Sequence, residues 1–230
     1  MITEQELIDA TLSAITNCQK TYLKWSYNEW LSYAPEYFLT VKIAEEISKI
    51  NKNKFITLED NVEKTLDISN AKGRGKISTG TRANGRYDIV VWWANGHPRA
   101  IIEVKNCVRN YRKIEEDITR ICDSLNRKSK DSTLRHGFIA FYIDNTYKRN
   151  AKEQLEKQIN NIFDQAKDFV SSKNLKIEYH IHKNHPFSED DNNVYGYVVF
   201  LIKKWLYIQG NTKLEHDKLA TRLSLIIYKL

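Results

Sequence analysis

Apolar side chains recur along this chain with two different spacings. Spacings of three and four residues predict helices over residues 4–34, 36–49, 112–126, 148–170 and 213–228. Short apolar or alternating runs predict strands over residues 55–68, 87–93, 100–106, 138–143, 175–182 and 194–205. This order is typical of an α/β domain in which helices pack on a mixed central sheet.

Two of these strands are predicted to form a hairpin. Residues 87–93 are almost all apolar, as expected for a strand covered on both faces. The pair Asn95-Gly96, a strong turn signal, separates them from the apolar run 100–106. A basic loop with four glycines, residues 70–86, leads into the first strand of the hairpin.

The first 34 residues are interpreted as a helical extension that packs on the rest of the chain. Its last part carries four aromatic residues, Trp25, Tyr27, Trp30 and Tyr33. We expect these to pack against a domain spanning residues 35–230, whose core motif region covers about residues 36–145. Exposure of the same four side chains would instead favour a surface for a protein partner.

Composition limits the class of protein more than its function. The chain has 230 residues, a formal net charge of +7 and three cysteines with no metal-like spacing. No secretory leader or run of about 18 apolar residues is evident, so we expect a cytoplasmic protein with free thiols and no membrane partner. The positive charge favours an anionic partner such as nucleic acid.

Three charged residues of the hairpin are the main candidates for chemistry. Asp88 lies in the first apolar strand, and Glu103 and Lys105 lie on one face of the second because side chains alternate along a strand. A bend or bulge could bring Asp88 next to Glu103. Burying such charges is costly unless they pair or bind a metal.

Two carboxylates with a lysine beside them suit phosphodiester hydrolysis. Carboxylate oxygens are ligands for Mg²⁺, with Mn²⁺ as an alternative, and the metal would activate a water. Lys105 could hold or deprotonate that water, or stabilise the charge that develops on a phosphate. The simpler alternative is a structural salt bridge between Lys105 and Asp88 or Glu103.

The arrangement Asp88…Glu103-Val104-Lys105 in this setting resembles the PD-(D/E)xK nuclease superfamily. The resemblance implies a restriction-endonuclease-like fold, with Asp88 and Glu103 as metal ligands and Lys105 as the catalytic lysine. Tyr87 replaces the proline of the family name, at a position that supplies no ligand. Members often add an acidic residue from the helix before the sheet. Glu46, at the margin of the apolar stripe of helix 36–49, is our candidate over Glu45.

Basic residues flank these three positions. Five lie in the glycine-rich loop before Asp88, and three follow Lys105: Lys72, Arg74, Lys76, Arg82, Arg86, Arg109, Arg112 and Lys113. They would suit contacts with DNA phosphates, although a solvated loop and an ordinary helix start explain them equally well. Asp117 and Arg120, in the next helix, could brace the site or form a surface pair.

The sequence therefore favours a Mg²⁺-dependent endonuclease that hydrolyses DNA and could act as a homodimer. The family resemblance implies a role in restriction, defence or mobile-element biology of a prokaryote or phage. The alternatives are a nucleic-acid-binding module without cleavage, or a protein-interaction module on the same fold.

Overall fold

The computed structural model describes residues 1–73, 75–127, 132–181 and 192–204. In that part of the chain, six strands form one mixed sheet in the order β1-β2-β3-β4-β6-β5. Strands β3 and β4 are parallel, and the other neighbours are antiparallel. The strand bounds are β1 Lys54–Asn61, β2 Arg86–Trp93, β3 Pro98–Lys105, β4 His136–Thr146, β5 Leu175–Ile181 and β6 Asn193–Lys204. The expectation of an α/β chain with a mixed sheet is confirmed.

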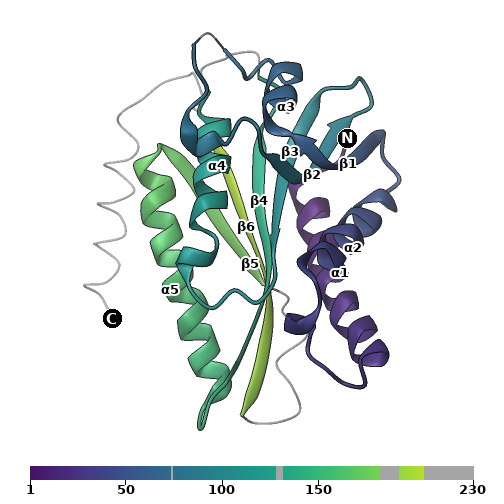
Figure 1. The fold of residues 1–230 in the computed structure, drawn as a ribbon, viewed down its shortest axis with the longest axis vertical. Helices are drawn as coiled ribbons and strands as arrows, with labels where there is room; N and C mark the ends of the chain where they lie inside the picture. Colours follow the sequence, from purple (N-terminus) through teal and green to yellow (C-terminus); the bar gives the residue numbers. More distant parts are fainter. Residues whose placement is uncertain (74, 128–131, 182–191, 205–230) are drawn as a thin grey trace, which may run out of the picture.

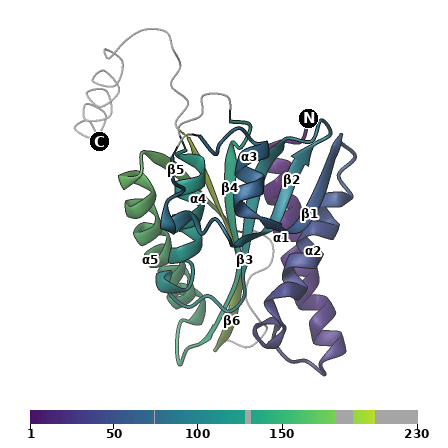
Figure 2. The same ribbon diagram turned by 45° about the horizontal axis from the view of Figure 1, so that its top comes forward.

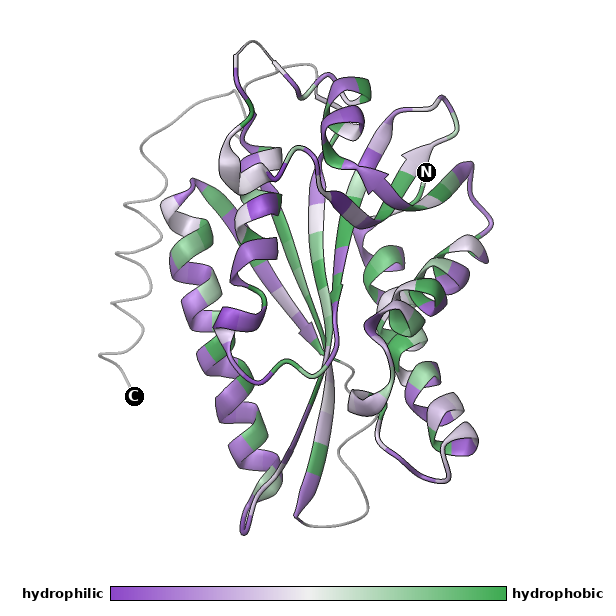
Figure 3. Ribbon diagram, in the orientation of Figure 1, coloured by the Kyte–Doolittle hydropathy of each residue, from purple (hydrophilic) through white to green (hydrophobic). Residues whose placement is uncertain are grey.

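Helices cover both faces of the sheet (Figures 1 and 2). Helices α1 (Glu4–Trp25) and α2 (Glu36–Ser48) pack on one face, and α4 (Glu115–Leu125) and α5 (Ala151–Ser172) pack on the other. Successive residues of each strand enter opposite cores, so that Val104 packs with α1 and α2 whereas Ile101 faces α4 and α5. The central strands are accordingly mostly green in Figure 3, and the helices turn mainly purple positions outward.

The hairpin of β2 and β3 contains an irregularity that sets its register. Gly96 takes a positive φ of 85° in the turn, and Trp92 pairs with Pro98. The register then shifts by one residue, so that Val91 pairs with Ala100 and Ile89 with Ile102. This shift agrees with the bulge expected from the sequence, and it brings Asp88 to the level of Glu103.

Helix α4 lies close against the sheet because β4 has a glycine beneath it. A Cβ atom on Gly137 would lie 2.1 Å from Cγ2 of Ile121, too close for any side chain. The stripe of Ile118, Ile121, Cys122 and Leu125, predicted from the sequence, is buried in this contact. The contact fixes the distance from the sheet to the polar residues on the first turns of α4.

The prediction of one strand over residues 55–68 is wrong in its second half. Strand β1 ends at Asn61, and a short helix, α3 (Val62–Ile68), follows. The side chain of Asn61 accepts a hydrogen bond from the backbone N–H of Lys64 (2.9 Å), which caps the helix. Val62 and Leu66, four residues apart, are both buried, and this spacing fits a helix rather than a strand.

The predicted helix 4–34 ends earlier, at Trp25, because Tyr27 and Asn28 adopt positive φ angles. Short 3₁₀ turns follow at Leu31–Tyr33, and elsewhere at Thr79–Thr81 and Tyr111–Lys113. The expectation that the aromatic residues pack on the core is wrong for most of them: Trp25 is 69%, Tyr27 95% and Tyr33 72% exposed. Trp30 is half-buried and packs edge-on against Tyr195.

Two further points concern the predicted last helix and the expected lack of a membrane span. The helix predicted over residues 213–228 lies outside the described residues. No helix in the part of the chain that the structure describes is long and apolar enough to cross a bilayer.

Candidate functional site

Six charged side chains meet near the carboxyl end of β3. Four are acidic and two are basic, and they come from α2, β2, β3 and α4: Glu36, Asp88, Glu103, Lys105, Asp117 and Arg120. We call this group the Lys105 cluster. It unites the three hairpin residues predicted from the sequence with two residues of the following helix and one of the preceding helix.

Lys105 ties the sheet to both helix layers. Its Nζ lies 3.2 Å from Oε1 of Glu36 and 3.3 Å from Oδ2 of Asp117. Burial by itself would lower the pKa of Lys105, but the carboxylates of Asp117, Glu36 and Asp88 outweigh it and raise that pKa. Lys105 is therefore a cation at neutral pH, which suits the stabilisation of negative charge and not the removal of a proton from water.

Asp88 lies on the strand beside Lys105 with one oxygen engaged. Its Oδ2 accepts a hydrogen bond from the backbone N–H of Val104 at 2.7 Å. Burial raises the pKa of the Asp88 carboxyl, and the negative charges of Asp117 and Glu36 act in the same direction, against the Val104 N–H and Lys105. The carboxylate is thus held at an electrostatic cost.

Glu103 is the most unusual member of the cluster. The residue is 1% exposed, and neither of its oxygens has a hydrogen-bond partner among the described residues. Nε of Arg120 lies 3.4 Å from Oε1 as an ion pair without hydrogen-bond geometry. Burial raises the pKa of Glu103 well above its ordinary value, more than Arg120 lowers it, and Asp88 and Asp117 raise it further. A buried carboxylate without donors favours a proton or a cation as its partner.

Arg120 and Asp117 brace the cluster from α4. The guanidinium binds the carboxylate of Asp117 and donates from Nη1 to the backbone oxygen of Arg86 at 2.7 Å. Both side chains are buried. Of the two interpretations left open by the sequence, the bracing role fits this geometry and the surface pair does not.

Glu36 is a site residue that the sequence argument missed. It begins α2, and its Oε2 accepts a hydrogen bond from the backbone N–H of Asn106 at 3.0 Å while Oε1 faces Lys105. The predicted Glu46 lies near the other end of α2, about 15 Å along the axis, where it pairs with Lys49 at 2.7 Å. The structure therefore brings Glu36, and not Glu46, to Lys105. Pro35 followed by an acidic first-turn residue was the available signal.

The residues present fit a Mg²⁺ ion held in part by the protein. No group of three or more His, Cys, Asp or Glu side chains among the described residues has the arrangement of a complete metal site. Magnesium commonly uses only one or two carboxylates, with water and phosphate oxygens as the other ligands. Asp88 and Glu103 offer that pair, and the unbonded oxygens of Glu103 are the observation in favour.

The predicted DNA-contacting residues separate into two groups. At the end of the molecule near Lys105, Arg86, Arg112 and Lys113 are exposed and form no ion pair within the described ranges. Arg82 pairs with Glu116 at 3.3 Å, and Arg109 with Asp144 at 3.5 Å.

The other group lies near the opposite end of α4. Lys72 pairs with Glu63 at 3.0 Å, and Lys76 lines a hollow with Asn126 and Arg127 from the end of α4. Arg74 lies outside the described residues. The basic residues of the loop 70–86 therefore do not form one continuous surface at the site.

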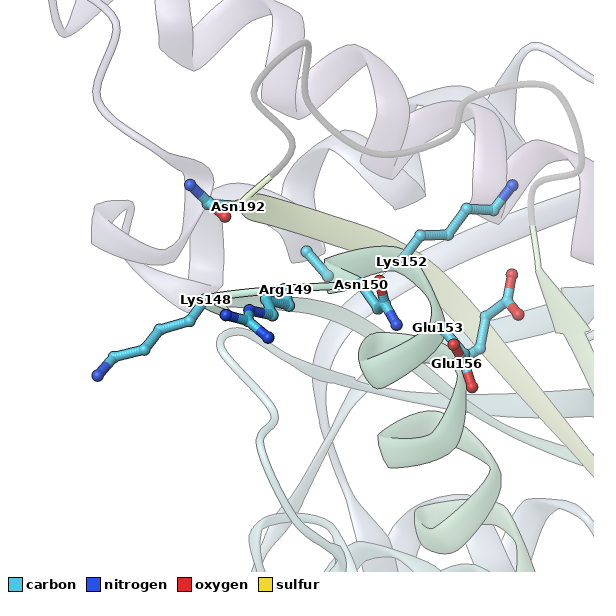
Figure 4. A pocket seen from close by; sticks show the side chains of 8 residues that line it. Lys148, Arg149, Asn150, Lys152, Glu153, Glu156 and Asn192 are labelled. Atoms are coloured by element: carbon cyan, nitrogen blue, oxygen red, sulfur yellow. The ribbon is translucent and has the colours of Figure 1, made fainter.

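Further basic residues, which the sequence argument did not single out, lie at the start of α5. They line an open hollow of about 790 Å³, together with Glu153 and Glu156: Lys148, Arg149 and Lys152. In Figure 4, Lys148 extends away from the acidic pair, and Lys152 extends in the opposite direction. Because α5 follows β4, which is parallel to β3, this hollow lies at the same end of the sheet as Lys105.

Comparisons of this chain with models of protein families, with curated proteins and with solved structures found no match.

Proposed function

We propose that this protein is a metal-dependent nuclease that hydrolyses phosphodiester bonds in DNA, on a core of the restriction-endonuclease-like type. The observation that carries the proposal is the pairing of two poorly satisfied carboxylates, Asp88 and Glu103, with the cationic Lys105 on adjacent strands. Structural ion pairs normally satisfy their carboxylates, whereas a metal site leaves oxygens for the ion.

Each residue has a distinct task in this reaction. Asp88 and Glu103 would hold Mg²⁺, which supplies an acidified water and neutralises charge on the phosphate. Lys105 would stabilise the extra negative charge on the non-bridging phosphate oxygens. Glu36 and Asp117 hold the Lys105 ammonium group in place from two sides. The water would give up one proton to solvent as its oxygen bonds to phosphorus, the bond from phosphorus to the leaving deoxyribose oxygen would break, and that leaving oxygen would take a proton from solvent.

The biological setting stays a proposal that rests on the PD-(D/E)xK resemblance: restriction, defence or mobile-element biology. Exposed basic residues around the site support a nucleic-acid substrate, since they would contact phosphates without reading sequence. Cutting both strands of a duplex would call for two copies of the site, which is why a homodimer is part of the proposal.

The test is cleavage of plasmid and linear DNA with Mg²⁺, with Mn²⁺ and with EDTA. Asp88→Asn and Lys105→Met keep side-chain size and should abolish metal-dependent cleavage. Lys203→Met is the matched control. Lys203 also bridges two carboxylates, those of Glu4 and Glu178, but it lies toward the opposite end of the sheet from Lys105. Binding of DNA without cleavage by any metal would disprove the nuclease.

A protein-interaction role is a second candidate, favoured by the exposed Trp25 and Tyr27 at the end of α1. Truncation of this segment would also damage the core, so substitutions are the better test. Trp25→Ser and Tyr27→Ser should abolish capture of a partner while leaving DNA cleavage intact. Retained capture by the double variant would remove this candidate.

A further inference from the structure

A third hollow, of about 510 Å³, lies near the Lys105 cluster. It is bounded by the segment between α1 and α2, by Arg109 just after β3, and by the facing ends of β4 and β6. Asn106 connects it to the cluster, because its side-chain Nδ2 donates to the backbone oxygens of Leu31 and Ala34, both at 2.8 Å, while its backbone N–H binds Glu36.

Two aromatic residues, Trp30 and Tyr33, are among those that line this hollow. Tyr33 is 72% exposed, although its neighbours Leu31 and Ala34 are buried. Trp30 is held edge-on against Tyr195, with ring centroids 6.2 Å apart. An exposed tyrosine on a backbone fixed by its buried neighbours presents a flat apolar face to whatever enters the hollow.

Side-chain amides also line the hollow. Nδ2 of Asn145 donates to Tyr147 and Gln158 at 3.1 and 3.2 Å, and its Oδ1 accepts from the backbone N–H of Thr146, so the side chain is fixed and keeps an acceptor position on Oδ1. Asn28 and Asn193 also line the hollow. Amides carry donors and acceptors together, as the edges of nucleobases do.

Arg109 supplies positive charge at the rim. Its guanidinium lies 3.5 Å from Oδ1 of Asp144, yet its side chain is 58% exposed whereas that of Asp144 is 3% exposed. The arginine therefore remains accessible to an anion while the acid is covered. Lys148 and Arg149, which follow Thr146 closely in the chain, add positive charge in the neighbouring hollow of Figure 4.

We propose that this hollow binds an unpaired nucleotide of the substrate, next to the bond that is cut. A flat ring, amides and an exposed arginine are the groups that bind a splayed-out base and its phosphate. A volume of about 510 Å³ lies within the range of small-molecule sites. The inference rests on the proposed function for its substrate, and it adds that the DNA contains a single-stranded stretch at the site.

The test measures binding in EDTA, so that it does not depend on cleavage. Anisotropy of a labelled single-stranded DNA oligonucleotide is compared with that of the duplex of the same sequence. Tyr33→Ala should weaken single-strand binding about tenfold, because one base stacked on an aromatic ring accounts for an effect of that order. Tyr37→Ala is the matched control, since Tyr37 is 52% exposed on α2 and does not line the hollow.

The outcomes separate this inference from the nuclease itself. Equal binding by the Tyr33 and Tyr37 variants, or binding by the wild type to the duplex alone, would overturn the hollow as a nucleotide site even if cleavage is observed. Conversely, a Tyr33-dependent preference for single strands in a protein that never cuts would leave the hollow standing and disprove the nuclease.

Discussion

Two charged clusters lie toward opposite ends of the sheet and differ in how their acids are satisfied. The Lys105 cluster lies at the carboxyl end of β3, and a second, the Lys203 cluster, joins Glu4, His136, Glu178 and Lys203 about 16 Å back along the strands. In the second, both oxygens of Glu4 have partners: His136 Nε2 at 2.7 Å and Lys203 Nζ at 2.6 Å. In the first, neither oxygen of Glu103 forms a hydrogen bond within the described residues.

The pKa values follow this difference. Burial would raise the pKa of Glu4, but its bonds to Lys203 and His136 outweigh burial and lower it. For Glu103 burial dominates, and the pKa rises well above the ordinary value. Burial also lowers the pKa of His136 to about 4, so that histidine is neutral near pH 7. The acid Glu4 of the Lys203 cluster is thus satisfied, although Nδ1 of His136 has no hydrogen-bond partner among the described residues, whereas the Lys105 cluster holds an acid at a cost that indicates a function.

The largest expected effect is a difference in DNA cleavage between two variants with the same chemical change, Glu103→Gln and Glu4→Gln. Glu103→Gln removes a charged metal ligand and should reduce DNA cleavage by about 10³-fold, or about 4 kcal/mol of transition-state stabilisation. Glu4→Gln removes the satisfied acid of the Lys203 cluster and should leave cleavage unchanged. Rates on linear DNA with saturating Mg²⁺ measure both. Comparable losses in the two variants would remove the functional distinction between the clusters.

Metal binding should also distinguish the two clusters, through its effect on Tm. A cation that binds the folded state at about 100 times its dissociation constant adds about 2.7 kcal/mol of stability. Ca²⁺ or Mg²⁺ should therefore raise the Tm of the wild type and of Glu4→Gln, but not that of Glu103→Gln. Scanning calorimetry without DNA gives the answer. An identical Tm rise in all three proteins would place the ion elsewhere.

The same two substitutions should change the free energy of unfolding in opposite directions. At pH 7, Glu103→Gln replaces an acid whose ionised form is disfavoured by burial, and should stabilise the metal-free protein by about 1 kcal/mol. Glu4→Gln breaks partly exposed bonds and should destabilise it by less than about 1 kcal/mol. Urea titrations measure both. Destabilisation by Glu103→Gln would mean that Arg120 satisfies Glu103 better than their geometry suggests.

The pH dependence has a defined sign for each acid. The raised pKa of Glu103 adds stability that is complete below its unfolded value near 4.5 and is lost as pH rises through the folded value. The lowered pKa of Glu4 adds stability that is present above 4.5 and is lost as pH falls through the folded value. Wild-type stability should therefore fall as pH rises from about 4.5 toward neutrality, and Glu103→Gln should flatten that fall in urea titrations.

The smallest effect concerns basic residues near and far from the Lys105 cluster. Arg112→Ala should reduce the slope of log K against log salt for DNA binding by about one, because each phosphate contact releases about one counterion. Lys72→Ala, whose lysine already pairs with Glu63, should leave the slope unchanged. Equal slopes in both variants would indicate that DNA does not approach along the β3 end.

Local sequence patterns were enough to predict most of the described helices and strands. The hairpin, the apolar stripe of α4 and the covered strands each follow from a periodicity that the structure retains. The prediction of a single strand over residues 55–68 failed because Asn61 caps a helix through a side-chain hydrogen bond, which the alternation of apolar residues does not reveal. The prediction that the aromatic residues at the end of α1 pack on the core failed for another reason. Tyr27 and Asn28 turn the chain, and the aromatic residue type alone does not show whether a ring is buried.

The sequence by itself indicated the three hairpin residues, since alternation places Glu103 and Lys105 on one face and the turn returns the chain toward the strand of Asp88; the register shift between Val91 and Trp92 then brings Asp88 level with Glu103. Only the tertiary structure decided which helical acid joins them. Glu36 meets Lys105 because the start of α2 is tied to Asn106, and Asp117 does so because Gly137 lets α4 approach the sheet. These contacts join residues from 12 to 70 positions apart, and their geometry depends on how whole layers pack, which no local spacing records.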